Sequence, residues 1–365
     1  MPEALSVPIH GGDVAAVAGR YGEGDWLDFS ANINPAGPPP AVLAALRAAA
    51  EDVTLLVHYP SAHERALQAA LATRFGWERE QIVIANGASA IIEAFVRGVA
   101  PRRCLLPQPA FSEYGRALAA QGAQTIPFRL EPSADFALDT DALVETLRRE
   151  RPDACIITNP HNPSGSLTPR EHVRRILECA RELRIALMID EAFIDYVPDA
   201  SVVADVLAAD DEVLVLRSLT KFYAMPGLRV GYAVASARFA GAIAKRVPSW
   251  PVTSLAAVAA VAALEDEAYE RRTRTENERA RTQFSREIAA AGARALPSAA
   301  NFLQVESPLA ASELTDRLAR RHRIIVRDCS TYSTLEGGRF VRIAVRSQND
   351  NTSLARALAQ ELRAC

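Results

Sequence analysis

Short apolar runs alternate with longer segments of helical periodicity through the first two thirds of the chain. A run of about four to eight apolar residues between turn signals is typical of a buried strand, and an apolar period of about 3.6 indicates a helix. Strands are predicted at 82–85, 104–106, 154–158, 185–189 and 213–216, and helices at 41–50, 63–75, 87–96, after 111, and at 169–183. Repeated strand-then-helix units predict an α/β fold with a mostly parallel sheet and helices on both faces.

The pattern changes toward both ends of the chain. Glycine, proline and asparagine are frequent in residues 1–40, which predicts an irregular, ordered arm. A helical region at 255–290 becomes highly charged, and we interpret it as a solvated bridge to a second domain. Strands at 302–305, 324–326 and 340–345 and helices at 311–320 and 354–363 are expected there. The predicted organisation is an arm (1–40) packing with the small domain and active site, a large domain (41–254) and a smaller α+β domain (255–365).

Composition narrows the class of protein. With 49% hydrophobic and 23% charged residues over 365 positions, the chain is an ordinary globular protein long enough for two domains. The formal net charge of -3 gives no general attraction to nucleic acid or to an anionic membrane. Five scattered cysteines without a C-x-x-C pair and six histidines without ligand spacing argue against a disulfide framework or a metal site. Residues 1–13 lack a basic region followed by an apolar core, so we expect a cytoplasmic protein.

One lysine stands among apolar residues just beyond a predicted strand. Lys221 ends the sequence Ser218-Leu219-Thr220-Lys221, and two aromatic residues follow it. Apolar surroundings disfavour the ammonium form, which lowers the pKa and leaves an amine able to attack a carbonyl carbon. The hydroxyls of Ser218 and Thr220 and the guanidinium of Arg229 are suited to a phosphate. Together these groups indicate pyridoxal phosphate, whereas the stretch alone also fits a lysine whose charged end reaches solvent.

Distinctive residues also follow the other predicted strands. Ligands of parallel α/β sheets bind beyond the carboxyl ends of the strands, so these residues are expected to converge. Asp190 could hold a pyridinium nitrogen protonated, Asn162 could donate to a phenolic oxygen, and Phe111 could stack on a ring. A phosphate cradle is expected where a helix opens directly after a strand, at Gly87, Ala88 and Ser89. Taken singly, these residues also fit helix caps, a tight turn and a core aromatic.

The order and spacing of these residues resemble a known family. Asn-Pro-x-Asn-Pro-x-Gly begins at Asn159, Asp-Glu-Ala-Phe at Asp190, and Ser-x-Thr-Lys at Ser218, with Arg229 eight residues after Lys221. The combination, over roughly residues 55 to 345, resembles the fold type I pyridoxal-phosphate enzymes of the histidinol-phosphate aminotransferase branch.

The resemblance implies a role for each cofactor-binding residue, and it implies that two subunits assemble. It assigns the Schiff base to Lys221, the pyridine nitrogen to Asp190, the phenolic oxygen to Asn162 and ring stacking to Phe111. Arg342, in Phe-Val-Arg-Ile, would bind the substrate carboxylate. Tyr59, in His-Tyr-Pro, resembles the family's tyrosine that reaches the cofactor phosphate of the neighbouring subunit, which implies a homodimer with shared active sites.

Residue 193 and the N-terminal arm resemble one particular branch of this family more closely than the aminotransferases. The aminotransferases of this branch usually carry tyrosine in Asp-Glu-Ala-Tyr, whereas this chain has Phe193 and lacks that hydroxyl group. Segments 9–13 and 27–37 closely resemble the start of the threonine-phosphate decarboxylases of cobalamin biosynthesis, which also tend to have phenylalanine there. This resemblance implies conversion of L-threonine O-3-phosphate to (R)-1-amino-2-propanol O-2-phosphate and carbon dioxide.

A small phosphorylated amino acid would need two anchors for its anionic groups. Guanidinium groups bind carboxylate and phosphate in two places, which makes Arg327 and Arg342 the best candidates, in either assignment. Arg327 equally fits an ion pair with a nearby carboxylate such as Asp328. The arm could close over the substrate through His10, Gly11, Gly12 and Asn32, although His10 also fits an ordinary loop histidine.

Two other functions use the same residues or a related domain. A histidinol-phosphate-type aminotransferase, working with 2-oxoglutarate and glutamate, needs the same cofactor ligands and differs in which bond at Cα stands out of the ring plane. A ligand-sensing domain of a transcription regulator would need a helix-turn-helix extension and a basic face, and the sequence shows neither. The decarboxylase is therefore the first hypothesis and the aminotransferase the second.

Overall fold

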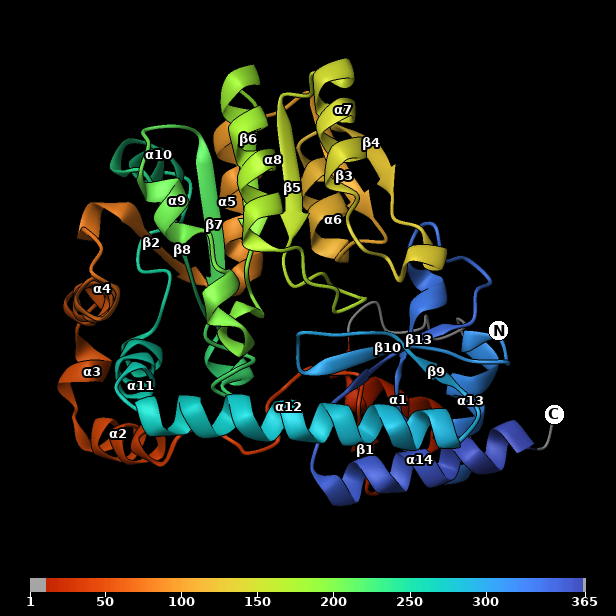
Figure 1. The fold of residues 1–365 in the computed structure, drawn as a ribbon. Coiled ribbons are helices and arrows are strands. Elements are labelled where there is room, and N and C mark those ends of the chain that lie inside the picture. Colours follow the sequence, from red (N-terminus) through yellow and green to blue (C-terminus); the bar gives the residue numbers. More distant parts are fainter. Residues whose placement is uncertain (1–10, 364–365) are drawn as a thin grey trace, which may run out of the picture.

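The largest sheet contains the strands predicted from the apolar runs. The computed structural model describes residues 11–363, except for the side chains of Ala62 and His63. Within these residues the largest sheet has seven strands in the order β2-β8-β7-β6-β5-β3-β4 (Figure 1). Their bounds are β2 Ile82–Asn86, β3 Arg103–Gln108, β4 Gln124–Arg129, β5 Ala154–Thr158, β6 Ala186–Asp190, β7 Val213–Ser218 and β8 Val230–Ala235. In this sheet only β8 is antiparallel to its neighbours, so the predicted mostly parallel sheet is confirmed.

Helices cover both faces of this sheet. One face carries α5 Gly87–Val99 and α6 Ser112–Ala120, and the other carries α7 Thr140–Glu150 and α8 Arg170–Leu183 (Figure 1). Two shorter helices, α9 Val203–Leu207 and α10 Ala237–Ala244, pack beside β7 and β8. Among residues 11–363, no helix combines the length and the apolar character that crossing a membrane requires.

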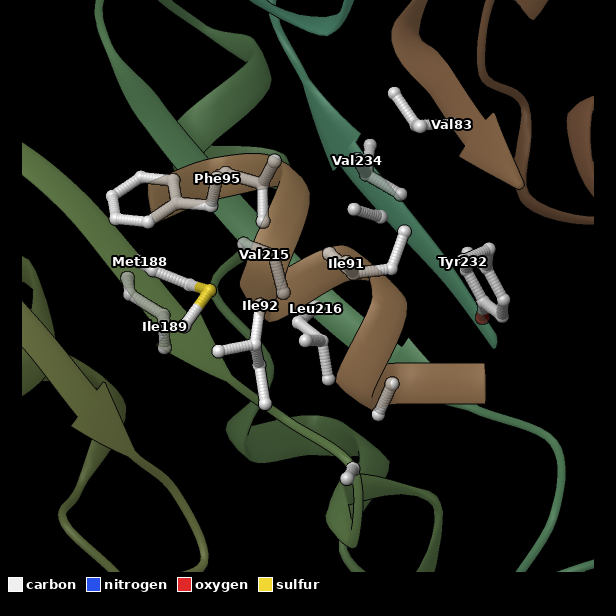
Figure 2. Packing of buried hydrophobic residues seen from close by; sticks show 14 of the residues in the cluster. Val83, Ile91, Ile92, Phe95, Met188, Ile189, Val215, Leu216, Tyr232 and Val234 are labelled. Atoms are coloured by element: carbon white, nitrogen blue, oxygen red, sulfur yellow. The ribbon is translucent and has the colours of Figure 1, made fainter. Parts of the chain in front are cut away.

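The packing of α5 fixes the point where the sheet meets its first helix. Ile91, Ile92 and Phe95 are fully buried in the large core, on the face of the sheet from which Met188 of β6 and Leu216 of β7 project (Figure 2). Burial of each of these large apolar side chains contributes about 1.5–3 kcal/mol relative to exposure. The first residue of α5 is thereby held directly at the carboxyl end of β2.

A group of helices packs beside the sheet and extends the large apolar core. It consists of α2 Pro40–Glu51, α3 Thr54–Val57, α4 Ser61–Phe75 and α11 Ser254–Leu264 (Figure 1). The alanine-rich α11 packs against α2 and α4, because its small side chains allow a close approach. Helix α11 therefore belongs to the large core, and the predicted helix over 255–290 is divided at Glu265 and Asp266.

The long helix α12 Glu267–Ala290 joins the two cores (Figure 1). Tyr269 near its start belongs to the large core, while Phe284 and Ile288 near its end belong to the small-domain core. The small-domain sheet is antiparallel, in the order β12 Arg327–Asp328, β13 Phe340–Ala344, β10 Phe302–Glu306 and β9 Arg294–Ala295. Helices α13 Ala311–His322 and α14 Gln348–Arg363 complete this domain.

The N-terminal arm is more regular than the sequence predicts. It contains helix α1 Val14–Tyr21 and strand β1 Leu27–Asp28, which pairs in parallel with β11 Ile324–Ile325 of the small domain. Phe29 is fully buried in the small-domain core. Farther along, the backbone N–H of Asn34 donates to the carbonyl oxygen of Lys221 at 3.1 Å. The arm therefore connects the small domain with the lysine loop.

A close contact between β8 and α5 generates a prediction about stability. A Cβ atom added to Gly231 would lie 2.7 Å from the backbone carbonyl carbon of Gly87 and 2.8 Å from the backbone nitrogen of Ala88. We expect Gly231→Ala to lower the free energy of unfolding by about 1–3 kcal/mol, because backbone atoms of two packed elements must move apart. Chemical denaturation followed by circular dichroism measures this change.

Gly241→Ala on α10 is the matched control. Nothing lies within 4 Å of a Cβ atom added there, and the residue is exposed. Alanine should therefore stabilise the helix by up to about 1 kcal/mol. Equal unfolding free energies for the two variants would contradict the contact seen between β8 and α5.

Candidate active site

The residues predicted from the sequence converge on one cavity. The cavity has a volume of about 370 Å³ and lies at the carboxyl ends of the large-sheet strands, facing the arm and the small domain. Its lining includes Gly11, Asn32, Ala88, Ser89, Phe111, Asn162, Asp190, Lys221, Arg229, Arg327 and Arg342. Four other predicted residues are not part of this lining but lie within three positions of a lining residue in the sequence: Gly12, Gly87, Ser218 and Thr220. His10 lies outside the described residues.

Lys221 lies just beyond β7 in a buried polar cluster. Its Nζ lies 3.3 Å from the hydroxyl oxygen of Ser218, which lies 2.8 Å from the hydroxyl oxygen of Thr220. Burial lowers the pKa of Lys221 to about 8; the carboxylate of Asp190 opposes this shift, while nearby guanidinium groups add to it. Roughly one lysine in ten is then a neutral amine at pH 7, which is the nucleophilic form.

Asp190 ends β6 and is held from two sides. Its Oδ2 accepts a hydrogen bond of 2.6 Å from the hydroxyl group of Tyr114, and its Oδ1 accepts one of 2.8 Å from the backbone N–H of Ala192. Burial raises the pKa of Asp190, and these two hydrogen bonds lower it by favouring the carboxylate. The sequence reasoning missed this role of Tyr114, although its position one helical turn after Phe111 signals that both face the strand ends.

The loop after β5 carries Asn162 and is tied to the loop after β3. His161 is buried, and burial lowers its pKa to about 4, so the ring is neutral. Its Nε2 lies 2.9 Å from the carbonyl oxygen of Pro109 and must donate, which leaves Nδ1 to accept from Ser164 at 2.7 Å. His161 thereby fixes the loop of Asn162 against that of Phe111, and motif reasoning gave no signal for it.

The start of α5 forms a cradle of a size that fits a phosphate group. Gly87 has a φ of +76°, and a Cβ atom there would lie 2.6 Å from Nη2 of Arg229. The guanidinium group of Arg229 therefore lies over the first turn of α5, where backbone N–H groups are free of helical partners. Ser89 adds a hydroxyl group in this turn. A cation, free N–H groups and a hydroxyl group are the donors that a phosphate requires.

Two arginines of the small domain face this cradle across the cavity. Nη1 of Arg342 donates to Oδ1 of Asn162 at 2.7 Å, and Nη2 donates to the carbonyl oxygen of Ser30 at 2.8 Å. Arg327 donates to the hydroxyl oxygen of Thr331 at 3.0 Å and lies over the ring of Tyr332. The lining includes Tyr332 as well, another residue that the sequence reasoning missed.

Two further residues of the sequence analysis occupy different places. Phe193 lines the cavity, and its ring centroid lies 6.0 Å from Nζ of Lys221. Tyr59 is 72% exposed and stacks on Trp250, with ring centroids 3.9 Å apart. Within one chain, Tyr59 therefore does not contribute to the cavity.

The site combines a lysine and an aspartate at strand ends with a phosphate cradle, and it faces a small domain that is joined by a long helix. This combination defines the class of fold type I pyridoxal-phosphate enzymes. The chain belongs to the aminotransferase class I and II family, whose sequence pattern matches residues 24–358. The lysine, aspartate, asparagine and cradle residues present here fit pyridoxal phosphate.

Comparisons with individual proteins agree with this assignment. The chain is 36% identical to the threonine-phosphate decarboxylase of Salmonella typhimurium, covering 98% of each chain. It is 30% identical to the histidinol-phosphate aminotransferase of Methanocella arvoryzae, covering 96% of this chain and 95% of the relative. The structure resembles the histidinol-phosphate aminotransferase of Sinorhizobium meliloti in complex with pyridoxal-5'-phosphate, with a TM-score of 0.87 and 26% identity, covering 99% of this chain and 96% of that one.

The lowered pKa of Lys221 generates a prediction about reactivity. In cofactor-free protein, we expect the rate of reductive methylation of Lys221 to rise with pH and to level off above about pH 8, because only the neutral amine attacks an aldehyde. Peptide mass spectrometry separates Lys221 from Lys245, the one other lysine of the chain, which is exposed and serves as an internal control. A midpoint for Lys221 near the ordinary lysine value of about 10.4 would contradict the prediction.

Proposed function

We propose that this protein is a pyridoxal-phosphate-dependent lyase that decarboxylates L-threonine O-3-phosphate to (R)-1-amino-2-propanol O-2-phosphate and carbon dioxide in cobalamin biosynthesis. The cavity that joins Lys221 and Asp190 to two buried arginines carries this proposal. The 36% identity to a threonine-phosphate decarboxylase over nearly the whole of both chains supports it.

The charges of the cavity suit a substrate with two anionic groups. Its lining carries the basic side chains of Lys221, Arg229, Arg327 and Arg342 and the acidic side chains of Asp190 and Glu113. Glu113 is also paired with Arg116, which lies outside the lining. Arg229 would bind the cofactor phosphate, and Arg327 and Arg342 are the proposed anchors for a phosphate and a carboxylate of the substrate.

The residues of the chain divide the chemistry among them. Pyridoxal phosphate, attached through Lys221, supplies an electron sink for the bond that breaks at Cα of the substrate. Asp190 is the group that holds a proton at the ring nitrogen, and Tyr114 helps to keep this carboxylate ionised. A proton must replace the departing carboxylate, and Nζ of Lys221 can carry it near neutral pH because its pKa is about 8.

Orientation at Cα separates this reaction from the second candidate. A histidinol-phosphate-type aminotransferase is supported by the 30% identity to the relative from Methanocella arvoryzae. The same cofactor residues serve both reactions, and the bond that breaks is the one that the anion anchors hold out of the ring plane. Phe193, which places no hydroxyl group beside Lys221, agrees with the decarboxylase branch of the sequence resemblance.

A paired assay tests the reaction. We expect purified holoenzyme to release carbon dioxide from L-threonine O-3-phosphate. It should form little glutamate from histidinol phosphate and 2-oxoglutarate. These expectations do not depend on the result measured with unphosphorylated threonine. Lys221→Ala should abolish the reaction, because among the described residues that line the cavity it removes the only side-chain amine, and Lys245→Ala should retain it. Transamination without carbon dioxide release would overturn the decarboxylase proposal in favour of the second candidate.

We also propose that the protein works as a homodimer in the cytoplasm. An exposed apolar surface on α3 and its flanking residues supports the dimer: Val53, Leu56, Val57 and Tyr59 are 66%, 77%, 66% and 72% exposed. A contiguous apolar surface of this kind on a folded chain marks a protein–protein contact. By the family resemblance, Tyr59 would reach the cofactor phosphate of the partner subunit from this surface.

The dimer proposal predicts the effect of a charge on this surface. Leu56→Asp should shift the protein from dimer toward monomer in size-exclusion chromatography with light scattering, because the carboxylate would be desolvated in the contact. It should also lower activity, because each site would lose Tyr59 of the partner. Leu167→Asp, at an exposed leucine of the loop before α8, is the control and should leave the mass unchanged. A monomeric wild type, or a dimer that tolerates Leu56→Asp, would refute the proposed surface.

A further inference from the structure

Arg342 belongs to a row of three polar side chains across the small-domain sheet. In the antiparallel register, Arg327 on β12 and Gln304 on β10 are both direct partners of Arg342 on β13. Direct partners project their side chains from the same face, with Cβ atoms about 4.5–5.5 Å apart. All three residues are buried, and Gln304 is 0% exposed. Gln304 therefore adjoins Arg342 on this face of the sheet, on the side away from Arg327.

Gln304 stands where an apolar residue would pack at less cost. Phe302, two residues earlier and on the same face of β10, belongs to the large core. Within residues 11–363, neither the amide oxygen nor the amide nitrogen of Gln304 has a hydrogen-bond partner, and the same is true of Nε of Arg342. Buried polar groups without partners are destabilising, so two of them on neighbouring strands indicate a shared role.

We propose that Gln304 is a positioning residue for Arg342. The two groups make no direct hydrogen bond, so one bridging water molecule accepts the Nε–H of Arg342 and donates to the amide oxygen of Gln304. This bridge fixes the rotation of the guanidinium group. Gln304 is not part of the cavity lining, so it acts on the substrate through Arg342. The inference rests on the proposed function for the identity of the anion that Arg342 receives.

The donor geometry of Arg342 explains what this contact achieves. A guanidinium group has five N–H donors in one plane. Asn162 and Ser30 occupy one donor on each terminal nitrogen, and the water bridge to Gln304 occupies the donor on Nε. One donor on each terminal nitrogen stays available for a carboxylate or a phosphate. A neutral amide in this position also leaves the positive charge of Arg342 and Arg327 for the substrate, whereas a carboxylate would neutralise part of it.

Two substitutions in the holoenzyme test the inference. Gln304→Met keeps the length of the side chain and removes its hydrogen bonds, and we expect KM for L-threonine O-3-phosphate to rise about 3- to 10-fold with kcat changed less than about twofold. Gln304→Glu should raise KM further, because its carboxylate pairs with the guanidinium group. Inorganic phosphate, detected through the cofactor absorbance and competition with substrate, should bind more weakly to both variants. Gln283→Met, at an exposed position of α12, is the control and should match the wild type.

The outcomes separate the inference from the proposed function. A wild type that does not decarboxylate threonine phosphate would refute the function, while the phosphate competition would still report on Gln304. If Gln304→Met binds substrate and phosphate like the wild type and melts at a higher temperature, Gln304 is an ordinary core residue and the inference fails. Should the methionine variant not fold, Gln304→Asn, which retracts the amide from Arg342, must weaken phosphate binding for the inference to stand.

Discussion

The geometry of the site depends on the parallel pairing of β6 and β7. In this register Asp190, the last residue of β6, pairs with Leu216, two residues before the end of β7 and five before Lys221. Directly behind these ends, Glu191 and Arg217 form an ion pair of 2.9 Å, with side chains only 1% and 6% exposed. Loss of either partner would leave a buried charge uncompensated, which is strongly destabilising. The pair therefore locks the two strand ends together, and with them the distance between amine and carboxylate.

The ion pair of Glu191 and Arg217 is connected through further polar contacts to α12, the helix that joins the small domain to the large one. Arg217 also lies 3.1 Å from Asp195, whose carbonyl oxygen accepts a hydrogen bond of 2.8 Å from Arg274 on α12. Arg274 in turn pairs with Glu270, which accepts a hydrogen bond of 2.7 Å from the hydroxyl group of Tyr223. The lysine loop and the start of α12 are thus parts of one buried network. Through this helix and the arm, the arginines of the small domain are placed relative to Lys221.

The sequence predicted those parts of the site that follow from local patterns. Apolar runs located the strands, and because parallel strands end at one edge, Lys221, Asp190 and Asn162 could be expected to meet. Contacts between distant segments left no such pattern. The sequence of α11 is apolar and alanine-rich without a polar face, so it does not indicate which core the helix joins. Helix α1 is short, and the glycine and proline residues near it obscure its helical pattern. The role of His161 depends on a neighbouring loop, which no spacing within the chain reveals, whereas the spacing of Tyr114 from Phe111 does indicate that it faces the strand ends.

The division of labour between the two domains explains why the cofactor was easier to infer than the reaction. The large domain supplies a lysine, an aspartate and a phosphate cradle that serve any reaction starting from an amino acid bound to pyridoxal phosphate. The choice among reactions depends on which bond at Cα is presented. Under the proposed function that presentation would be set by Arg327 and Arg342, two positive charges on adjacent strands. Like charges directly opposite each other are unfavourable unless an anion lies between them. Under the proposed function a substrate with two anionic groups would reduce this repulsion, so the two arginines that select the substrate would also orient it.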